Sequence, residues 1–356
     1  MNYSILLPSP HPTGPIKGAF ALANYLAPIR DVTIVYLKQG PGVDAYLDQR
    51  VKIVHLSEIS ESLIGRLLEY KSLLKNCGGR KSVASISMCF SADFFNLFLS
   101  SVSVTCASVR GNLLQNYRCD YGLFGIPFSF FHYIMLRKID HVLAMTEGMR
   151  KQIYKTSGVQ SKVIGNFIDE KPLESIRTRF TNKKGPLRFI FLGSLNKRKR
   201  PDLLVKAIKR LVEQGQDVKL DIVGEGPLMN ELEQFVLSNN LNEYVHLHGQ
   251  LKSPYQLIQA ADVFVLPSLS EGVSRASLEA LFLGVPCVLR DVDGNSDLLS
   301  NPFAGLIFSD EDELALTMVR AARLSKSRRV RKSLLPLEFQ QKKCAGNFLE
   351  LIEGSK

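Results

Sequence analysis

Short apolar runs alternate with helical stretches along most of the chain. The first run, YSILLPS at residues 3–9, favours a strand and is followed by a Gly/Pro loop at residues 10–18. The next stretch, AFALANYLAPI, has the apolar content of a buried helix. Similar apolar runs predict further strands at residues 32–37, 51–56, 82–88, 103–109 and 141–146. Alternation of this kind is typical of a parallel sheet covered by helices.

The pattern is interrupted once and then resumes. Residues 161–186 are polar, charged and punctuated by Gly and Pro, so we expect an interdomain linker there. The second series predicts strands at residues 187–194, 218–227, 245–250, 262–268 and 286–291, with helices at residues 200–215, 228–240, 253–261 and 274–283.

This organisation predicts an α/β protein built from two Rossmann-like parallel-sheet domains. A chain of 356 residues exceeds the usual size of one domain. We place the domains at residues 1–165 and 166–340, and we expect a C-terminal helix at residues 341–356 to pack back on the first domain. A ligand cleft is expected where the carboxyl ends of the strands of both domains face one another.

Composition narrows the class of protein. Hydrophobic residues make up 45% of the chain and charged residues 22%, as in globular proteins. The six cysteines include no C-x-x-C pair, so neither a zinc site nor a redox motif is indicated. The first residues resemble no signal peptide, and no run approaches the roughly 20 apolar residues of a membrane-spanning helix. We therefore predict a cytoplasmic protein, with peripheral binding at the inner face of a membrane as an addition.

The net charge of +11 lies mainly in residues 1–168. Such a basic half suits an anionic membrane face or a phosphate-bearing substrate, although it also fits a merely solvated surface. No nucleic-acid-binding pattern is present, so no nucleic acid partner is expected. The aromatic run Phe124–Tyr133 resembles a core helix of the first domain. Contact with a membrane is the alternative reading, because Arg118, Arg137 and Lys138 flank the run.

A candidate phosphate site follows the first strand of the second domain. The segment FIFLGSLNKRKRPDLL brings a strand to Gly193, and a loop of four cations then leads to Pro201 at the start of a helix. Free N–H groups at a helix N-terminus bind anions, and neighbouring cations strengthen such a site. A solvated basic loop is the alternative.

Two carboxylates stand eight residues apart in SEGVSRASLEALFLGVPCVLRD. Glu271 is predicted in a loop and Glu279 in the helix at residues 274–283, which Gly284 closes. At helical rise they are about 12 Å apart along the axis. This span suits hydroxyl groups at both ends of a nucleotide-sugar. A glycosidase pair has to lie within about 10 Å and flank one bond. The turn around Gly294 leads into another helix start.

The second half resembles retaining glycosyltransferases of the GT-B fold, family four, also called glycosyl transferases group 1. FLGSLNKRKRPDLL matches their G-x-L-x-x-x-K phosphate loop, and IVGEGP matches their G-x-G-P turn. VHLHGQL matches a strand ending in Gly, and EGVSRASLEALFLGVPCVLRDVDGN matches their E-x7-E segment with its Gly loop. VIGNFID resembles the element at their domain junction. The resemblance is strong over residues 140–308 and only architectural before them.

The resemblance implies a role for each matching residue. Lys199 would bind the donor diphosphate and stabilise the leaving nucleotide, Glu279 would hold the ribose hydroxyls, and Glu271 would contact the hexose. Gly14 and Gly18 would allow close approach to donor and acceptor. The remaining donor-binding positions that it implies are Gly193, Ser194, Gly224, Gly249, Gly272, Ser274 and Gly294.

Two positions depart from the family pattern. An Arg often follows the Gly of the phosphate loop, but Ser194 stands here, so a second cation must come from Arg198, Arg200 or elsewhere. Many members also carry a His in the middle of the first domain. The comparable region reads CASVRGNLLQNYR, where Arg110 or Asn112 occupies that place, and we take Arg110 as the candidate catalytic residue.

The resulting hypothesis is a retaining transferase that builds bacterial O-antigen, capsule or lipopolysaccharide. It would move a hexose or N-acetylhexosamine from a nucleotide-sugar to a lipid-linked or saccharide acceptor, and the resemblance favours UDP as the nucleotide. No cofactor and no metal are expected. The alternatives are a nucleotide-sugar epimerase on the same fold and a catalytically silent subunit that binds glycan or membrane.

Overall fold

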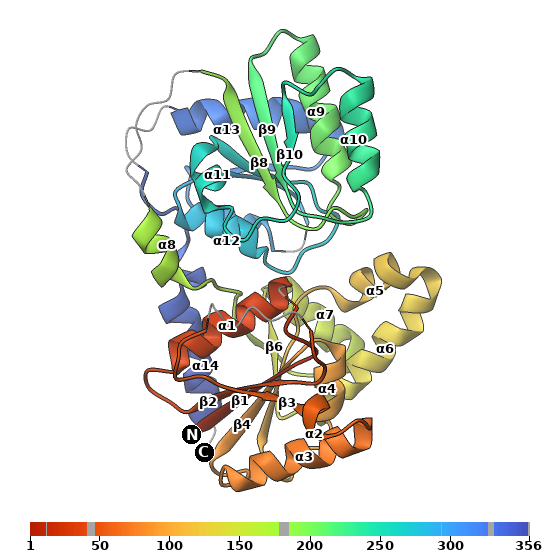
Figure 1. The fold of residues 1–356 in the computed structure, drawn as a ribbon, viewed down its shortest axis with the longest axis vertical. Helices are drawn as coiled ribbons and strands as arrows, with labels where there is room; N and C mark the ends of the chain where they lie inside the picture. Colours follow the sequence, from red (N-terminus) through yellow and green to blue (C-terminus); the bar gives the residue numbers. More distant parts are fainter. Residues whose placement is uncertain (12, 41–46, 178–184, 293, 327–330, 355–356) are drawn as a thin grey trace. The chain divides into compact units, whose positions relative to one another are not determined.

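The computed structural model describes residues 1–11, 13–40, 47–177, 185–292, 294–326 and 331–354. The chain divides into two compact units. The N-terminal unit comprises residues 1–169 and 338–356, and the C-terminal unit comprises residues 170–337. Each unit is a parallel sheet with helices on both faces, which confirms the predicted fold class (Figure 1).

The strands of the N-terminal unit form a parallel sheet in the order β3-β2-β1-β4-β5-β6-β7. The strands are β1 (Asn2–Leu7), β2 (Val32–Tyr36), β3 (Lys52–His55), β4 (Val83–Met88), β5 (Val104–Ser108), β6 (His141–Ala144) and β7 (Lys162–Val163). The helices are α1 (Gly14–Leu26), α2 (Leu56–Ile59), α3 (Leu63–Asn76), α4 (Phe90–Asn96), α5 (Leu113–Tyr121), η2 (Gly122–Phe124), α6 (Gly125–Met135), η3 (Leu136–Lys138), α7 (Glu147–Ser157), η6 (Leu337–Phe339) and α14 (Gln341–Glu353).

Strand β1 shows why this sheet is apolar on both faces. Successive side chains of a strand point to opposite faces. Ile5 and Leu7 enter the core beneath α1 and α14, whereas Leu6 enters the second core beneath α3 and α4. A parallel sheet covered on both faces requires apolar residues at both sets of positions. In Figure 1, α14 (blue) lies beside α1 (red) although they are far apart in sequence.

The C-terminal unit has the strand order β10-β9-β8-β11-β12-β13. Its strands are β8 (Leu187–Leu192), β9 (Val218–Val223), β10 (Val245–Leu247), β11 (Val263–Leu266), β12 (Cys287–Arg290) and β13 (Gly305–Phe308). Its helices are α8 (Glu170–Ile176), α9 (Pro201–Glu213), α10 (Met229–Ser238), α11 (Tyr255–Ala260), α12 (Arg275–Phe282), η4 (Ser296–Leu299), η5 (Glu311–Glu313) and α13 (Leu314–Lys326).

Helix packing in this unit follows from the strand order. Strands β8, β9 and β10 are added toward one edge of the sheet, and β11 then returns to pair with β8 on its other side. Right-handed crossovers therefore place α11 and α12 on the face opposite α9 and α10. Helix α13 packs against α9, and α12 packs against β11 and β12. The turn point between β8 and β11 is where open α/β sheets bind ligands, at the carboxyl ends of the strands.

Two expectations about individual elements were wrong. The loop expected at residues 10–18 ends early, because α1 already begins at Gly14 with Pro15 in its first turn. Proline fixes the backbone angle that a first helical turn needs. The aromatic segment expected as a core helix is α6, which packs on α5, α7 and α4 and leaves Phe130 and Phe131 about half exposed.

Among the helices that the structure describes, none has both the length and the apolar character that crossing a membrane requires.

Candidate functional site

Three glycines line the carboxyl edge of the C-terminal sheet. Gly193, Gly224 and Gly249 follow β8, β9 and β10, and the Gly224 N–H donates to the Gly249 carbonyl at 2.8 Å. Gly224 has a φ of 139°, and a Cβ there would lie 1.9 Å from the Gly193 oxygen. Only glycine allows this approach. The loops after the three strands are therefore held close together.

The loop after β8 directs Lys199. The Asn196 side chain accepts a hydrogen bond from the Lys199 backbone N–H at 3.0 Å. Arg200 then adopts a left-handed conformation with φ 50° and ψ 46°, and Pro201 opens α9. The Lys199 side chain is mostly buried, and its Cε would lie 4.0 Å from a Cβ on Gly193. The predicted phosphate loop is thus a tight turn with its lysine turned inward.

Lys199 pairs with Glu271 across two loops. The Lys199 ammonium donates to Glu271 Oε1, and Arg198 Nη1 lies 3.8 Å from the same oxygen. Burial opposes ionisation of Glu271, but the two cations outweigh it and hold its pKa below the ordinary value. Burial lowers the pKa of Lys199, against the attraction of Glu271. The result is a compact charged cluster at the ends of β8 and β11.

The second carboxylate lies on a helix. Ser274 caps α12 by accepting from the Ser277 N–H, and the buried Glu279 accepts from Arg275 at 3.3 Å. Glu271 and the buried Gly272 precede the helix, which begins only at Arg275. The helical spacing expected between the two carboxylates is therefore wrong, because half of the segment is a loop.

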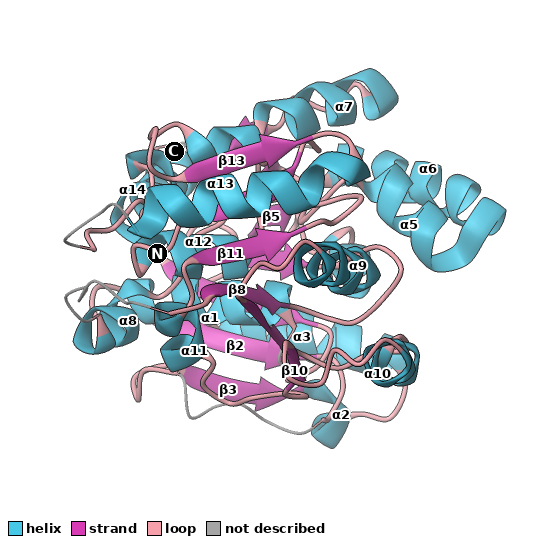
Figure 2. Cartoon of the chain, turned by 90° about the horizontal axis from the view of Figure 1, so that it is seen from above, coloured by secondary structure: helices cyan, strands magenta, loops and turns pink. Residues whose placement is uncertain are grey.

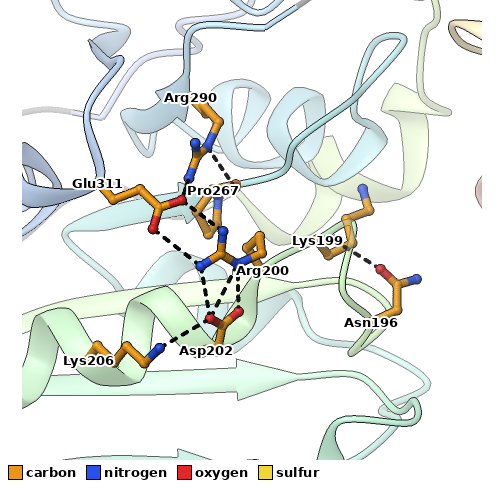
Figure 3. Close-up of polar contacts among 8 residues, drawn as sticks. All are labelled: Asn196, Lys199, Arg200, Asp202, Lys206, Pro267, Arg290 and Glu311. Atoms are coloured by element: carbon orange, nitrogen blue, oxygen red, sulfur yellow. Dashed lines mark hydrogen bonds and ion pairs between the residues drawn. The ribbon is translucent and has the colours of Figure 1, made fainter. Parts of the chain in front are cut away.

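The cations of the phosphate loop have different partners. Arg198 donates to the Ser270 carbonyl at 2.8 Å and lies beside Glu271. Arg200 instead binds Asp202 and Glu311 (Figure 3). Of Arg198 and Arg200, the two candidates for a second phosphate-binding cation, only Arg198 lies beside Glu271, the partner of Lys199. Ser194, which replaces the family arginine, is exposed.

The loop after β12 contributes a third segment. Gly294 and Asn295 are buried, and the Asn295 amide donates to the Arg290 carbonyl at 3.0 Å. The predicted turn also included Asp293, which lies outside the described residues.

The candidates of the N-terminal unit form a group of their own. A Cβ on Gly18 of α1 would meet Arg110 Nη1 at 3.1 Å and Asn166 Oδ1 at 3.4 Å. Arg110 donates to Asn166 at 2.8 Å, so the loop after β5 is tied to the VIGNFID segment beside α1. Gly14, one turn earlier, has open space where a Cβ would stand. Gly18 and Arg110 are brought together, as a small polar group over the helix.

Sequence reasoning missed Arg290 and Glu311. Arg290 ends β12 and donates to both the Pro267 carbonyl and Glu311. Glu311 lies in the acidic run SDEDE, which resembles a solvated turn. The arginine at the end of β12 was the available signal, because a charge at the carboxyl end of a buried strand requires a partner.

Comparison with known proteins finds relatives of this chain. The family Glycosyl transferases group 1 matches residues 174–332, nearly the whole C-terminal unit. The C-terminal unit is thus similar over most of its length to the group 1 glycosyltransferases. The chain is 35% identical over 143 residues to the Escherichia coli UDP-Gal:alpha-D-GlcNAc-diphosphoundecaprenol alpha-1,3-galactosyltransferase, and the match covers 39% of this chain and 37% of that protein.

The match to a second relative covers more of the chain. The N-acetylgalactosamine-N,N'-diacetylbacillosaminyl-diphospho-undecaprenol 4-alpha-N-acetylgalactosaminyltransferase of Campylobacter jejuni is 27% identical over 236 residues, 62% of either chain. The matches therefore span 37 to 62% of these two relatives. Among solved structures, Anabaena Alr3699/HepE in complex with UDP and glucose has a TM-score of 0.77 at 16% identity, covering 99% of both chains. This likeness shows the GT-B fold.

Proposed function

We propose that this protein is a retaining glycosyltransferase of bacterial surface polysaccharide synthesis, in O-antigen, capsule or lipopolysaccharide. It transfers a hexose or N-acetylhexosamine from a UDP-sugar to a lipid-linked or polysaccharide acceptor. One observation carries the proposal: Lys199 and Glu271 pair in a largely buried cluster at the carboxyl ends of β8 and β11, with Arg198 beside them. The names of both curated relatives contain a glycosyl group and a diphosphoundecaprenol acceptor, and one specifies UDP-Gal.

The cluster suits departure of a nucleoside diphosphate. Breaking the bond between the anomeric carbon and the β-phosphate oxygen leaves negative charge on that oxygen. In this proposal Lys199 and Arg198, which both lie beside Glu271, stabilise this charge. Preorganised groups of this kind supply much of an enzyme's rate. These cations make a divalent metal unnecessary, so we expect transfer to persist in a metal chelator.

The other residues take positioning roles in this proposal. Glu279 accepts the ribose hydroxyls, and Glu271 accepts a hydroxyl of the hexose. The glycines of the three strand ends allow backbone approach. Arg110 takes the place of the family's histidine, and the leaving phosphate accepts the acceptor's proton on the same face of the sugar, which gives retention.

Nucleotide binding is the direct test. UDP at about 100 times its Kd should stabilise the wild type by about 2.7 kcal/mol in a thermal-shift measurement. Lys199→Ala and Glu279→Ala should erase most of this effect, because they remove the phosphate and ribose contacts. Lys197→Ala is the matched control, since Lys197 is an exposed lysine of the same loop. Unchanged stabilisation in the two site variants would remove the site assignment.

Turnover separates the competing functions. A transferase releases UDP quickly only when a diphosphate-linked lipid acceptor is added, whereas an epimerase converts UDP-sugar without an acceptor. A silent binding subunit releases no UDP with any pair of donor and acceptor. Release that depends on the acceptor and persists in chelator supports the proposal.

A membrane surface is the partner that we propose for the N-terminal unit. Helices α5 and α6 form a hairpin that extends beyond its sheet (Figure 2), and Leu123 and Phe124 at its turn are 75% and 87% exposed. Residues 113–138 carry Arg118, Arg137 and Lys138, all exposed, against a single acid, Asp120. Exposed apolar residues on a basic hairpin suit an anionic lipid surface.

A further inference from the structure

One carboxylate joins two arginines, one of which is the sequence neighbour of Lys199. Glu311 Oε1 accepts from Arg200 Nη1 at 2.8 Å and from Arg290 Nη2 at 2.9 Å, and Glu311 Oε2 accepts from Arg200 at 3.3 Å (Figure 3). Glu311 lies on η5 after β13, Arg200 precedes α9 and Arg290 ends β12. The carboxylate therefore connects three segments that are distant in sequence.

The first arm of this cluster fixes the residue next to Lys199. Arg200 has a left-handed backbone, which is unfavourable for a residue with a side chain. Its guanidinium is held from two sides, by Asp202 at 3.0 Å and by Glu311. The Arg200 side chain is only 23% exposed. These bonds favour the turn that directs the neighbouring Lys199 side chain toward Glu271.

The second arm fixes the loop that carries Glu271. Arg290 Nε donates to the Pro267 carbonyl at 3.1 Å, directly after β11. The same loop donates from the Leu269 N–H to the Arg198 carbonyl at 2.8 Å. Glu311 thus acts on both sides of the Lys199–Glu271 pair, through Arg200 on one side and through Arg290 on the other.

The charge state of Glu311 suits this role. Partial burial opposes its ionisation, but hydrogen bonds from Arg290 and Arg200 outweigh burial and lower its pKa. The Glu311 carboxylate therefore stays ionised at neutral pH and binds the guanidinium groups of Arg200 and Arg290. Lys199 and Arg198 belong to the other cluster, beside Glu271.

We propose that Glu311 is a positioning residue for the nucleotide-sugar donor, which sets the phosphate loop and the Glu271 loop through Arg200 and Arg290 without touching substrate. This inference rests on the proposed function. The competing explanation is that the cluster only stabilises the fold.

The test is Glu311→Gln, which keeps the shape of the side chain and removes its charge. Asp312→Asn is the matched control, because Asp312 is the next residue, is 79% exposed and pairs with Arg210 on the surface. We expect the Kd for UDP, measured by calorimetry, and the KM for the donor to rise about tenfold in Glu311→Gln, as for one charge-assisted hydrogen bond lost. The kcat should stay within about twofold. The control should match the wild type.

Two further variants keep the test decisive. Arg290→Gln leaves the bond between Glu311 and Arg200 intact and should weaken UDP binding less than Glu311→Gln does. This variant replaces Glu311→Gln in the test if Glu311→Gln does not fold. In an Arg200→Gln background, Glu311→Gln should raise the Kd for UDP by a smaller factor than it does in the wild type, because both substitutions break the same contact. Additive effects would overturn the proposed route through Arg200.

The outcomes separate the two proposals. An unchanged Kd for UDP in Glu311→Gln overturns the positioning role. A lower unfolding midpoint without nucleotide, together with an unchanged Kd, assigns the cluster to the fold alone. Failure of the wild type to bind any nucleoside diphosphate instead overturns the proposed function itself.

Discussion

At the scale of single residues, the ammonium group of Lys199 has two anionic partners to consider, Glu271 and the diphosphate of the proposed donor. Glu271 and Lys199 form a mostly buried ion pair, and a donor diphosphate would bind the same ammonium group. Opposite charges interact strongly where water is scarce. The carboxylate therefore has two opposed effects, since it can orient the sugar and also compete with the phosphate.

Glu271→Gln separates these effects. UDP carries no hexose, so we expect the variant to bind UDP at least as tightly as the wild type. Transfer should fall about 10²-fold, as when one preorganised polar contact to a reacting group is lost. Calorimetry gives the first quantity and steady-state assays give the second. Weaker UDP binding in the variant would show that Glu271 mainly orients Lys199.

The sequence predicted the individual site residues better than their partners. Motif order pointed to Lys199, Glu271 and Glu279, whose roles stay predictions, but the pair between Lys199 and Glu271 had no local signal. Glu311 could not be found, because 111 residues separate it from Arg200. Such contacts depend on how β8, β12 and β13 line up in the sheet, and no local pattern records that order.

At the scale of elements, cap residues made some helices predictable. The helix expected at residues 274–283 appears as α12, with Ser274 as its cap and the left-handed Gly284 after it. Helix α6 was misjudged because an aromatic sequence does not reveal its neighbours. Its buried side holds His132, which bonds Asp93 and Tyr117 at 2.9 Å, while Phe130 and Phe131 remain partly exposed.

This exposed side should bind anionic lipid. The double variant Leu123→Ser, Phe124→Ser should co-sediment about tenfold less with phosphatidylglycerol vesicles than the wild type, because two apolar side chains are worth roughly 3 kcal/mol or less at such a surface. Thermal unfolding should be unchanged, since both side chains are exposed.

Two comparisons make the lipid measurement specific. Leu237→Ser removes a leucine of α10 that is 68% exposed in the other unit, and it should bind vesicles like the wild type. Vesicles of neutral phosphatidylcholine should bind less of the wild-type protein, because this lipid offers no net negative charge to the basic residues. Equal loss in both variants would contradict a lipid surface at the hairpin.

At the scale of the whole molecule, alternation of strands and helices was enough to predict two α/β units. It could not predict the contacts of the final helix in detail. Glu353 of α14 accepts from Arg30 and from Tyr3 at 2.9 Å, and Phe348 enters the core beneath α1. The last residues of the chain thereby contact its first strand.

Acid should weaken this contact in a defined window. Hydrogen bonds from Arg30, and then from Tyr3, lower the pKa of Glu353 to about 2, from about 4.3 in an unfolded chain. A depressed folded pKa adds stability above the unfolded pKa, and that stability is lost as the pH falls toward 2. Glu353→Gln should lower the unfolding midpoint of the N-terminal unit by about 2 °C at pH 7.

The difference between wild type and Glu353→Gln should therefore shrink from about pH 4.3 downward. Scanning calorimetry across that range measures it. Glu350→Gln is the matched control, because it removes a carboxylate at an exposed position one turn earlier on α14, and it should leave the unfolding midpoint at pH 7 unchanged. A difference that stays constant from pH 7 to pH 3 would contradict the assignment to Glu353.

The return of residues 338–356 to the first unit makes the second unit an insertion within it. A protease that cuts once after Asp169 therefore produces two fragments that α14 continues to hold together. A truncation that ends before residue 338 does not trim a tail, because it opens one wall of the first unit's core. The second unit can in turn be removed or exchanged as a cassette only if both of its junctions are rebuilt.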